Sequence, residues 1–316
     1  MSADGISVII CAYAQKRWPN LVAAVVSLQN QTLAAREIIV VIDHNQELFQ
    51  QVQARFPEVT VIENREARGL SGARNSGIAV AKGEFLAFLD DDAIAKPDWL
   101  AQLQSALVDT RVLGVGGAVV PDWAGPRPTW FPSEFQWVVG CTYVGMPRVS
   151  APIRNPVGAN MCLRREVFQA VGGFHNGIGR VGTLPVGCEE TELCIRARQY
   201  WSERFFLYIP QAQVSHYVPP QRATWRYFCT RCYAEGRSKA AISRLVGTKD
   251  ALSSESTYTL WTLPIGVLCN LYILLFKHRP AAFLRAVAII FGLSITATGY
   301  LIGKYEYSSS SMYKKE

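Results

Sequence analysis

The first hundred residues alternate between two hydrophobic patterns. Short apolar runs rich in Val and Ile are typical of buried strands, and between them lie longer segments with apolar residues at helical spacing. The expected elements are strands at 6–11, 37–42, 59–63 and 85–89 and helices at 19–29, 46–56 and 71–81. This alternation predicts an α/β fold with an open, mostly parallel central sheet, in which ligands bind beyond the carboxyl ends of the strands.

The middle of the chain has a weaker pattern. Residues 114–156 are rich in Gly, Pro and Trp, which predicts loops and short strands that close over a site. A second ordered region is expected from Gly158 onward. It contains a helix at 165–170, a segment at 187–193 that leads into a helix ending at about residue 200, a strand at 205–209 and a basic, aromatic helix at 225–245.

Two apolar runs distinguish the last part of the chain. Residues 257–276 carry no charge over 20 positions and residues 286–303 carry none over 18, whereas about 20 apolar residues cross a bilayer. Two membrane spans are one interpretation. A helical hairpin lying in one leaflet is another, because two spans would place Lys277, Arg279 and Arg285 in an external loop, against the usual distribution of basic residues. A buried helix pair in a soluble protein is the third.

Net charge and its position narrow the class of partner. The formal charge of +7 suits nucleic acid, anionic lipid or a phosphorylated substrate. The basic residues have no nucleic-acid-binding signature and cluster just before the apolar runs, so we expect membrane lipid rather than nucleic acid as a partner. The basic face would consist of Arg226, Arg231, Arg237, Lys239 and Arg244.

These patterns predict three parts: a catalytic domain at 1–220, a basic, aromatic helical linker at the membrane surface at 221–256, and two hydrophobic membrane helices with a short tail at 257–316. We expect no secretory signal before the strand at 6–11. The eight cysteines are therefore expected to be reduced, and the protein to lie at the cytoplasmic face of the cell membrane, anchored by its C-terminal hydrophobic segments.

Polar residues follow the four expected N-terminal strands. Tyr13 follows the first, Asp43 ends the second, the segment 64–72 follows the third, and three consecutive aspartates at 90–92 end the fourth. One nucleotide-sized crevice could contact all four. Three like charges at the end of an apolar strand repel one another unless a cation or a sugar hydroxyl binds them. A helix N-cap is the alternative, and Asp98 is available for that function.

Four motifs occur in a defined order: SVIICAYAQKR, SLQNQT, EIIVVIDHN and REARGLSGARNSGIAVAKGEFLAFLDDD. Over about residues 5–235 the chain resembles family 2 of the inverting nucleotide-sugar glycosyltransferases, which have the GT-A fold. The resemblance implies a nucleotide-sugar donor, expected to be a UDP-sugar, and Mn²⁺ or Mg²⁺. The cation is needed because negative charge grows on the departing diphosphate. The Gln-x-x-Arg-Trp motif of processive synthases is not reproduced by RARQYW, which favours addition of a single sugar.

The resemblance also implies roles for residues at the donor. Ala12 and Tyr13 would flank the base, Asp43 would bind uracil or ribose, and Arg74 would approach the diphosphate. The three glycines Gly69, Gly72 and Gly77 fit turns and close packing as well as phosphate contact.

A second group of residues is expected around the cation. Asp92 would bind the metal, Asp91 would bind ribose or sugar, and Asp90 is grouped with the donor-binding residues. His216, in PQAQVSHYV, would complete the metal or diphosphate site, although a single histidine is often structural.

The segment CEETEL occupies the place of the family's Glu-Asp pair at the start of a helix. The resemblance implies that Glu190 is the general base, with one methylene more than the usual Asp, and Glu192 is its nearest rival. Glu189 and Asn160 are expected at the acceptor. Within the family, VVIDHN and LDDDAIAKPDWL resemble archaeal transferases that add a hexuronic acid to a dolichyl-phosphate-linked sugar. This implies a uronic acid or hexose donor and a polyprenyl-linked or glycan acceptor.

Two other classes of protein compete with the transferase interpretation. A catalytically inactive, membrane-associated scaffold that binds nucleotide sugars would be expected to lose one of the acidic sets, and both FLDDDA and CEETEL are present. A nucleotidyltransferase would need a glycine-rich loop after the first strand, and CAYAQKRWPN contains no glycine.

Overall fold

The computed structural model describes residues 5–179 and 187–312. The chain divides into two compact units. The first consists of Met1–Val120, Pro147–Leu184 and Glu189–Tyr217, and the second of Pro121–Met146, Pro185–Cys188 and Val218–Glu316. The segment 121–146, which we expected within the catalytic domain, thus groups with the C-terminal helices.

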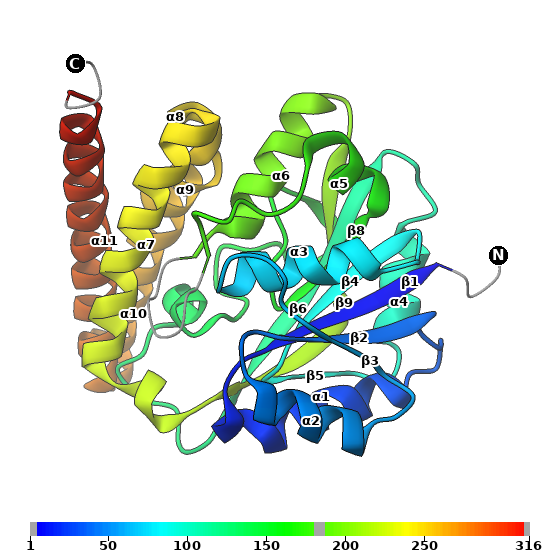
Figure 1. Ribbon diagram of the computed structural model, residues 1–316. Coiled ribbons are helices and arrows are strands. Elements are labelled where there is room, and N and C mark those ends of the chain that lie inside the picture. The colour runs from blue at the N-terminus through cyan, green and yellow to red at the C-terminus, as the bar shows by residue number, and fades with distance from the viewer. Residues whose placement is uncertain (1–4, 180–186, 313–316) are drawn as a thin grey trace. The chain divides into compact units, whose positions relative to one another are not determined.

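The first unit is built on a nine-stranded sheet (Figure 1). The strands are β1 (Ile6–Ala12), β2 (Glu37–Ile42), β3 (Thr60–Glu63), β4 (Phe85–Asp90), β5 (Ala93–Ala95), β6 (Val112–Trp123), β7 (Ala151–Ile153), β8 (Asn160–Arg164) and β9 (Phe205–Val218). Their order is β3-β2-β1-β4-β8-β6-β9-β5, and β7 pairs with β9. The first four strands are parallel, whereas β8 is antiparallel to β4. Because β1 lies between β2 and β4, the chain changes direction across the sheet there, where α/β proteins bind ligands.

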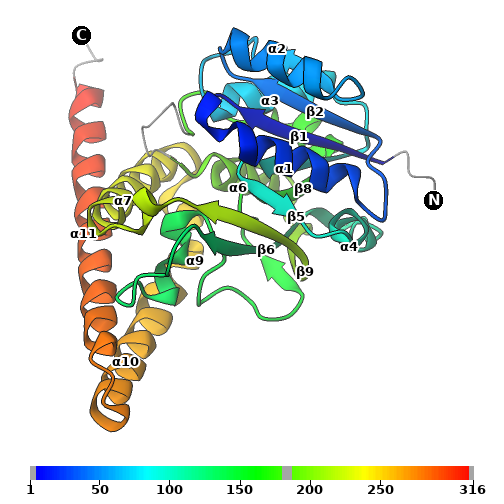
Figure 2. The same ribbon diagram turned by 90° about the horizontal axis from the view of Figure 1, so that it is seen from below.

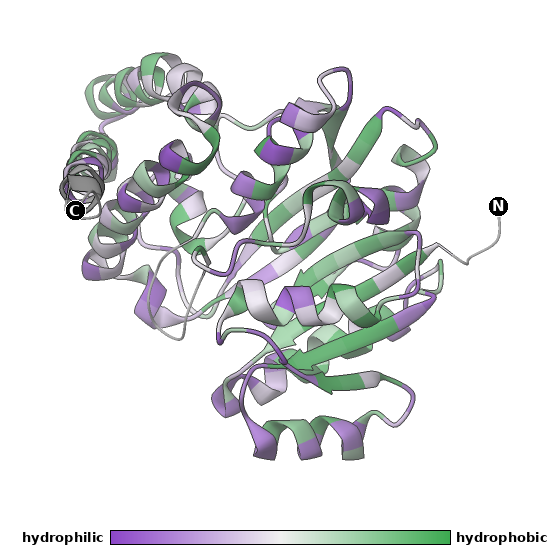
Figure 3. Ribbon diagram, turned by 45° about the horizontal axis from the view of Figure 1, so that its top comes forward, coloured by the Kyte–Doolittle hydropathy of each residue, from purple (hydrophilic) through white to green (hydrophobic). Residues whose placement is uncertain are grey.

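Helices cover both faces of this sheet. They are α1 (Trp18–Gln29), α2 (Gln46–Arg55), α3 (Leu70–Val80), α4 (Trp99–Ala106), α5 (Arg165–Val171) and α6 (Glu189–Tyr200), with a 3-10 turn, η1 (Gln15–Arg17), before α1. Alternate strand residues such as Ile9 and Phe88 pack with α3, α5 and α6 in one core. Figure 2 shows α3 and α1 on opposite sides of β1, and the green strands in Figure 3 are these buried apolar segments. The expected α/β fold is therefore confirmed.

Two segments differ from expectation. Residues 114–156 were predicted to form loops and short strands, but they include most of the 12-residue β6 and a 3-10 helix, η2 (Ser133–Val139). The glycines of β6 permit close packing of strands, since a Cβ at Gly117 would overlap the carbonyl oxygen of Ala212. The strand predicted at 205–209 is only the start of the 14-residue β9, whose later half alternates polar and buried residues.

The second unit is mostly helical. It contains η3 (Pro220–Ala223), α7 (Trp225–Val246), α8 (Thr248–Ala251), α9 (Ser253–Thr257), a π-helical turn η4 (Tyr258–Thr262), α10 (Leu263–Lys277) and α11 (Ala281–Met312). Helices α7 and α11 approach closely at glycines: a Cβ at Gly236 would overlap the Thr296 carbonyl, and a Cβ at Gly299 the Tyr233 carbonyl. Trp225 of α7 also stacks on Phe291 of α11.

Among the residues of this unit that the structure describes, two helical stretches are long and apolar enough to cross a membrane, judged by length and composition. They are Ser253–Lys277, with 25 residues, and Ala281–Glu306, with 26. Large apolar side chains on them are exposed, including Leu268 and Leu275, each 65% exposed.

The basic face expected on α7 is smaller than the sequence indicated. Arg231 and Lys239 are buried, and Lys239 Nζ lies 2.7 Å from a carboxylate oxygen of Glu255. Their charges therefore stabilise contacts within the unit, which corrects the expectation that they meet lipid headgroups. Arg226, Arg237 and Arg244 remain exposed, and their spacings of 11 and 7 residues place them on one side of the helix.

Candidate active site

Strands β1, β2 and β4 bring their carboxyl ends together in the first unit. Asp90 pairs in register with Cys11, so the aspartates at 90–92 leave the sheet beside the end of β1. Ala12 is buried, and its carbonyl accepts a hydrogen bond from the Asp43 N–H at the end of β2. Tyr13, the next residue, is 37% exposed. The strand ends thus meet as the sequence pattern indicated, while the nucleotide-sized crevice and the roles of Ala12 and Tyr13 toward a base stay predictions.

Asp43 organises the turn that follows β3. Its Oδ1 accepts a 2.7 Å hydrogen bond from Asn64 Nδ2, and its Oδ2 accepts one of 3.0 Å from the Gly69 N–H. The Nδ1 of His44, a residue with a positive φ of 54°, lies 2.8 Å from Asp43 Oδ1. Asp43 therefore fixes the loop that leads into α3. His44 was not singled out from the sequence and Asn64 was named only as the start of the polar segment 64–72, because their only signal is their position beside a strand end.

The acidic cluster after β4 forms a candidate cation site. One ligand atom from each of Asp90, Asp92 and His216 lies within 4.8 Å of the others. His216 reaches the cluster because β9 pairs with β5, with His216 opposite Ala93, and its Nε2 lies 3.1 Å from Asp92 Oδ1. Two carboxylates and an imidazole are a donor set that fits Mn²⁺, and Mg²⁺ with water in the remaining positions. The structure thus brings His216 to Asp92, as expected for the metal site, and adds Asp90, which was expected among the donor-binding residues.

Arg17 also belongs to this cluster, although it was not predicted from the sequence. Its Nη1 lies 2.6 Å from Asp91 Oδ1 and 3.4 Å from Asp92 Oδ2. Burial raises the pKa of Asp91 to about 7, and Arg17 opposes that rise. Burial lowers the pKa of Arg17, but the charges of Asp91 and Asp92 outweigh that effect and raise it. The only sequence signal for Arg17 was a basic residue shortly after the first strand.

Arg74 lies deeper than its expected role at the diphosphate implies. It is 2% exposed and binds Glu189 Oε1 at 2.8 Å and the Gly158 carbonyl at 3.0 Å, while Asp90 Oδ1 is 3.5 Å away. Burial lowers the pKa of Arg74, but the carboxylates of Glu189 and Asp90, with smaller contributions that include Glu190, raise it overall. Arg74 therefore connects the cation cluster to the start of α6.

The three acids in the first turn of α6 have different environments. Glu189 is buried against Arg74, and Glu192 is buried with its Oε2 2.9 Å from Arg196 Nη2. Glu190 is the most exposed of the three. Glu190 is thus the most accessible of the three acids and Glu189 forms an ion pair with Arg74, while the role of Glu190 as general base stays a prediction.

Asn160 does not lie where an acceptor could reach it. The side chain is fully buried; Oδ1 accepts from Trp99 Nε1 at 2.8 Å, and Nδ2 donates to the carbonyls of Ala118 and Ala212. These bonds use both of its N–H groups. Asn160 is therefore a structural residue that holds β6, β8, β9 and α4 together, which corrects its expected role as an acceptor ligand.

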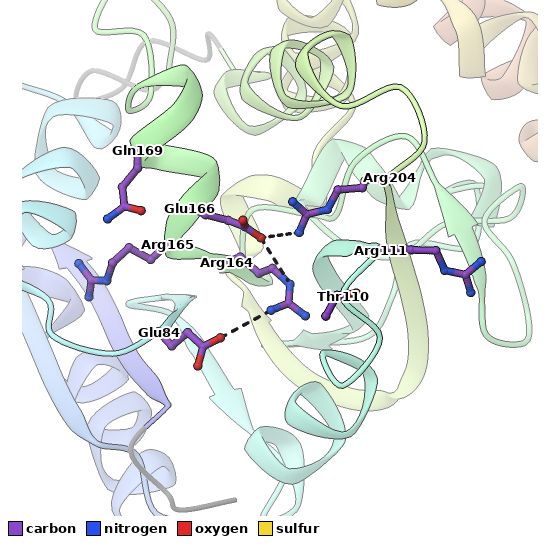
Figure 4. A pocket seen from close by; sticks show the side chains of 8 residues that line it. All are labelled: Glu84, Thr110, Arg111, Arg164, Arg165, Glu166, Gln169 and Arg204. Atoms are coloured by element: carbon purple, nitrogen blue, oxygen red, sulfur yellow. Dashed lines mark hydrogen bonds and ion pairs between the residues drawn. The ribbon is translucent and has the colours of Figure 1, made fainter.

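A separate pocket of about 630 Å³ lies at the amino end of β4, opposite the acidic cluster. Figure 4 shows its four arginines and two glutamates, with Glu166 between Arg164 and Arg204. Arg164 also donates to the carbonyls of Val112 and Asp109, and Arg165 to that of Gly83. These arginines thus join the ends of neighbouring strands and helices.

Known proteins are similar to this chain in sequence or in fold. A glucosyl-dolichyl phosphate glucuronosyltransferase of Haloferax volcanii is 32% identical over 306 residues, which cover 94% of this chain and 96% of that protein. The mannosyltransferase PcManGT of Pyrobaculum calidifontis, solved with GDP-Man and Mn²⁺, matches 98% of this chain and 88% of its own, with a TM-score of 0.58 and 18% identity. GalNAc-T7, solved with UDP, GalNAc and Mn²⁺, matches 81% of this chain and 56% of its own, with a TM-score of 0.50 and 17% identity.

The two solved structures confirm the GT-A fold implied by the sequence motifs. Residues 7–172 match the model of glycosyl transferase family 2. The chain therefore belongs to glycosyl transferase family 2 and is a glycosyltransferase.

Proposed function

We propose that this glycosyltransferase transfers a single hexose or hexuronic acid, with inversion, from a UDP-sugar to a polyprenyl-linked or glycan acceptor. The observation that carries the proposal is the Arg74 connection: one guanidinium binds Glu189, next to Glu190, and lies 3.5 Å from Asp90 of the cation cluster. This connection supports the proposal because it would keep a group that stabilises the leaving diphosphate near a group that accepts a proton.

A divalent cation held by Asp90, Asp92 and His216 would stabilise the negative charge that grows on the departing diphosphate. Manganese is supported by both solved neighbours, whose structures were determined with Mn²⁺. The protein supplies the donor side through Tyr13, whose ring can stack on a base, and Asp43, whose remaining lone pairs can accept from an imide or hydroxyl.

Glu190 would act on the acceptor. Its carboxylate removes the proton from the acceptor hydroxyl, the hydroxyl oxygen forms a bond to the anomeric carbon, and the bond from that carbon to the diphosphate oxygen breaks with its electron pair on the diphosphate. Attack from the face opposite the nucleotide inverts the anomeric configuration.

The Haloferax volcanii relative supports a lipid-linked acceptor, because its name specifies glucosyl-dolichyl phosphate as the group that receives glucuronic acid. The exposed apolar side chains of α10 and α11 support attachment to a membrane. We place the enzyme at the cytoplasmic face, since nucleotide sugars and the exposed arginines of α7 both suit that surface.

The test is a panel of UDP-glucose, UDP-glucuronic acid and GDP-mannose, each measured for thermal stabilisation with Mn²⁺ and with excess EDTA. Ligand binding raises the melting temperature by mass action, so the donor should stabilise the protein only with the cation present. The product formed from that donor should have the inverted anomeric configuration by NMR. Equal stabilisation in EDTA, or a retained configuration, would contradict the proposal.

A further inference from the structure

Arg17 places a permanent positive charge against two of the three strand-end aspartates. Its Nη1 lies 2.6 Å from Asp91 Oδ1 and 3.4 Å from Asp92 Oδ2. The aspartate side chains are 4% and 5% exposed, whereas that of Arg17 is 24% exposed. The guanidinium therefore neutralises buried carboxylates from the more accessible side of the cluster.

Asp92 is shared between Arg17 and the candidate cation site. Its Oδ1 faces His216 Nε2 at 3.1 Å, and its Oδ2 faces Arg17 at 3.4 Å. A cation bound by Asp90, Asp92 and His216 would have the guanidinium as its neighbour across a single carboxylate. Two positive charges at that separation repel each other, so Arg17 in this position lowers the affinity for the cation.

In the same conformer the guanidinium also lies near the end of β1. Arg17 Cζ is 5.7 Å from the centroid of the Tyr13 ring, so the side chain spans from the aspartates to the end of β1. A diphosphate bound beside the cation would present oxygens that a guanidinium can bind in a bidentate manner. Movement of Arg17 to those oxygens would relieve its repulsion with the cation and add a bond to the donor.

We propose that Arg17 couples cation binding to donor binding: it occupies Asp91 and Asp92 when the donor is absent and binds the diphosphate when the donor is present. The inference rests on the proposed metal-dependent function and adds to it an order of binding. Without nucleotide the cation binds weakly, and with nucleotide both bind tightly.

The test measures Mn²⁺ binding to the full-length protein by the electron paramagnetic resonance of free Mn²⁺, first alone and then with UDP or GDP. Arg17→Ala should bind Mn²⁺ alone about tenfold or more tightly than the parent protein, because the competing charge is gone. With Mn²⁺ present it should bind the nucleotide about tenfold more weakly. Arg17→Lys keeps a charge and should resemble the parent in Mn²⁺ binding alone.

Arg55→Ala is the matched control, because it removes the same charge from an exposed arginine on α2 whose guanidinium lies over the Phe56 ring. It should leave both affinities unchanged. If Arg17 only fixed the shape of the acidic loop, Arg17→Ala would weaken Mn²⁺ binding. Unchanged or weaker binding of Mn²⁺ alone to Arg17→Ala therefore overturns the proposal. If neither the parent nor Arg17→Ala binds Mn²⁺, the metal-dependent function itself fails and the role of Arg17 fails with it.

Discussion

Arg74 and Glu189 form a buried ion pair, with Nη1 and Oε1 2.8 Å apart and both side chains less than a tenth exposed. Arg74→Ala would leave Glu189 and Asp90 without this counter-charge. Removing one partner of a buried pair costs about 3–5 kcal/mol, so we expect the melting temperature to fall on the order of 10 °C. Calorimetry measures this change.

A double variant separates stability from function at this pair. Arg74→Met combined with Glu189→Leu removes both charges while keeping apolar volume, and it should recover much of the lost stability. Transfer activity should stay low in the double variant, because α6 is no longer tied to Asp90. Full activity in the double variant would show that the ion pair has no part in positioning the site.

Asp92→Asn should lower turnover by about a hundredfold or more, since it removes a charged ligand of the cation that stabilises the leaving group. Asp98→Asn is the control: Asp98 directly precedes α4 and accepts a hydrogen bond from Gln102, so the same chemical change there should have little effect. A radiolabelled sugar-transfer assay with and without EDTA checks both. Undiminished activity in excess EDTA contradicts a role for metal.

Glu190→Gln should bind nucleotide and Mn²⁺ normally while turnover falls by about 10²–10⁴, the usual contribution of a general base. Glu192→Gln provides the comparison, because Glu192 forms an ion pair with Arg196. This substitution should lower thermal stability more than it lowers turnover. Single-turnover kinetics measure the two variants. Turnover of Glu190→Gln within a few-fold of the parent would remove Glu190 from the role of base.

Charges placed on the exposed face of α10 should weaken membrane attachment. Leu268→Glu with Leu275→Glu introduces two charges seven residues apart on side chains that are each 65% exposed. We expect co-sedimentation with anionic liposomes to fall by at least about tenfold, because a charge in the bilayer costs about 3 kcal/mol. Val108→Glu with Val149→Glu makes the same change on exposed valines of the first unit and should leave sedimentation intact.

Substitution is a better test of the tail than truncation. Removal of α11 would uncover the face of α7 on which Gly236 and Tyr233 contact it, so a shortened chain would lose a packed core as well as an apolar surface. Attachment of the double glutamate variant as strong as that of the parent would exclude α10 as the membrane contact.

The parallel half of the fold was predictable because β1, β2 and β4 are buried almost throughout and therefore appear as continuous apolar runs. Strand β9 was not, because Gln211, Gln213 and Ser215 interrupt its second half with polar residues. His216 was consequently expected after a strand instead of within one. The pairing of β9 with β5, which places His216 opposite Ala93, joins segments far apart in the sequence, so no local pattern predicts it.

The site was predictable where residue type and strand end coincide, as for Asp43 and Asp92. It was not predictable where a polar residue has a partner far along the chain. Asn160 looks the same in a sequence whether it is exposed to an acceptor or fully buried between strands, and only the packing of Trp99 and β9 decides. The contacts of Arg17 likewise depend on the position of the aspartates at the end of β4, which the sequence near Arg17 does not indicate.

The glycine contacts between α7 and α11 determine how that helix pair responds to its surroundings. Where the backbones meet at Gly236 and Gly299, attraction comes mainly from dispersion between closely packed atoms and much less from the release of water around large side chains. Such a contact has nearly the same strength in water, in detergent and in hydrocarbon. We therefore expect α7 and α11 to remain paired when the enzyme is moved from detergent micelles to lipid nanodiscs, which cysteine cross-linking in both media would reveal.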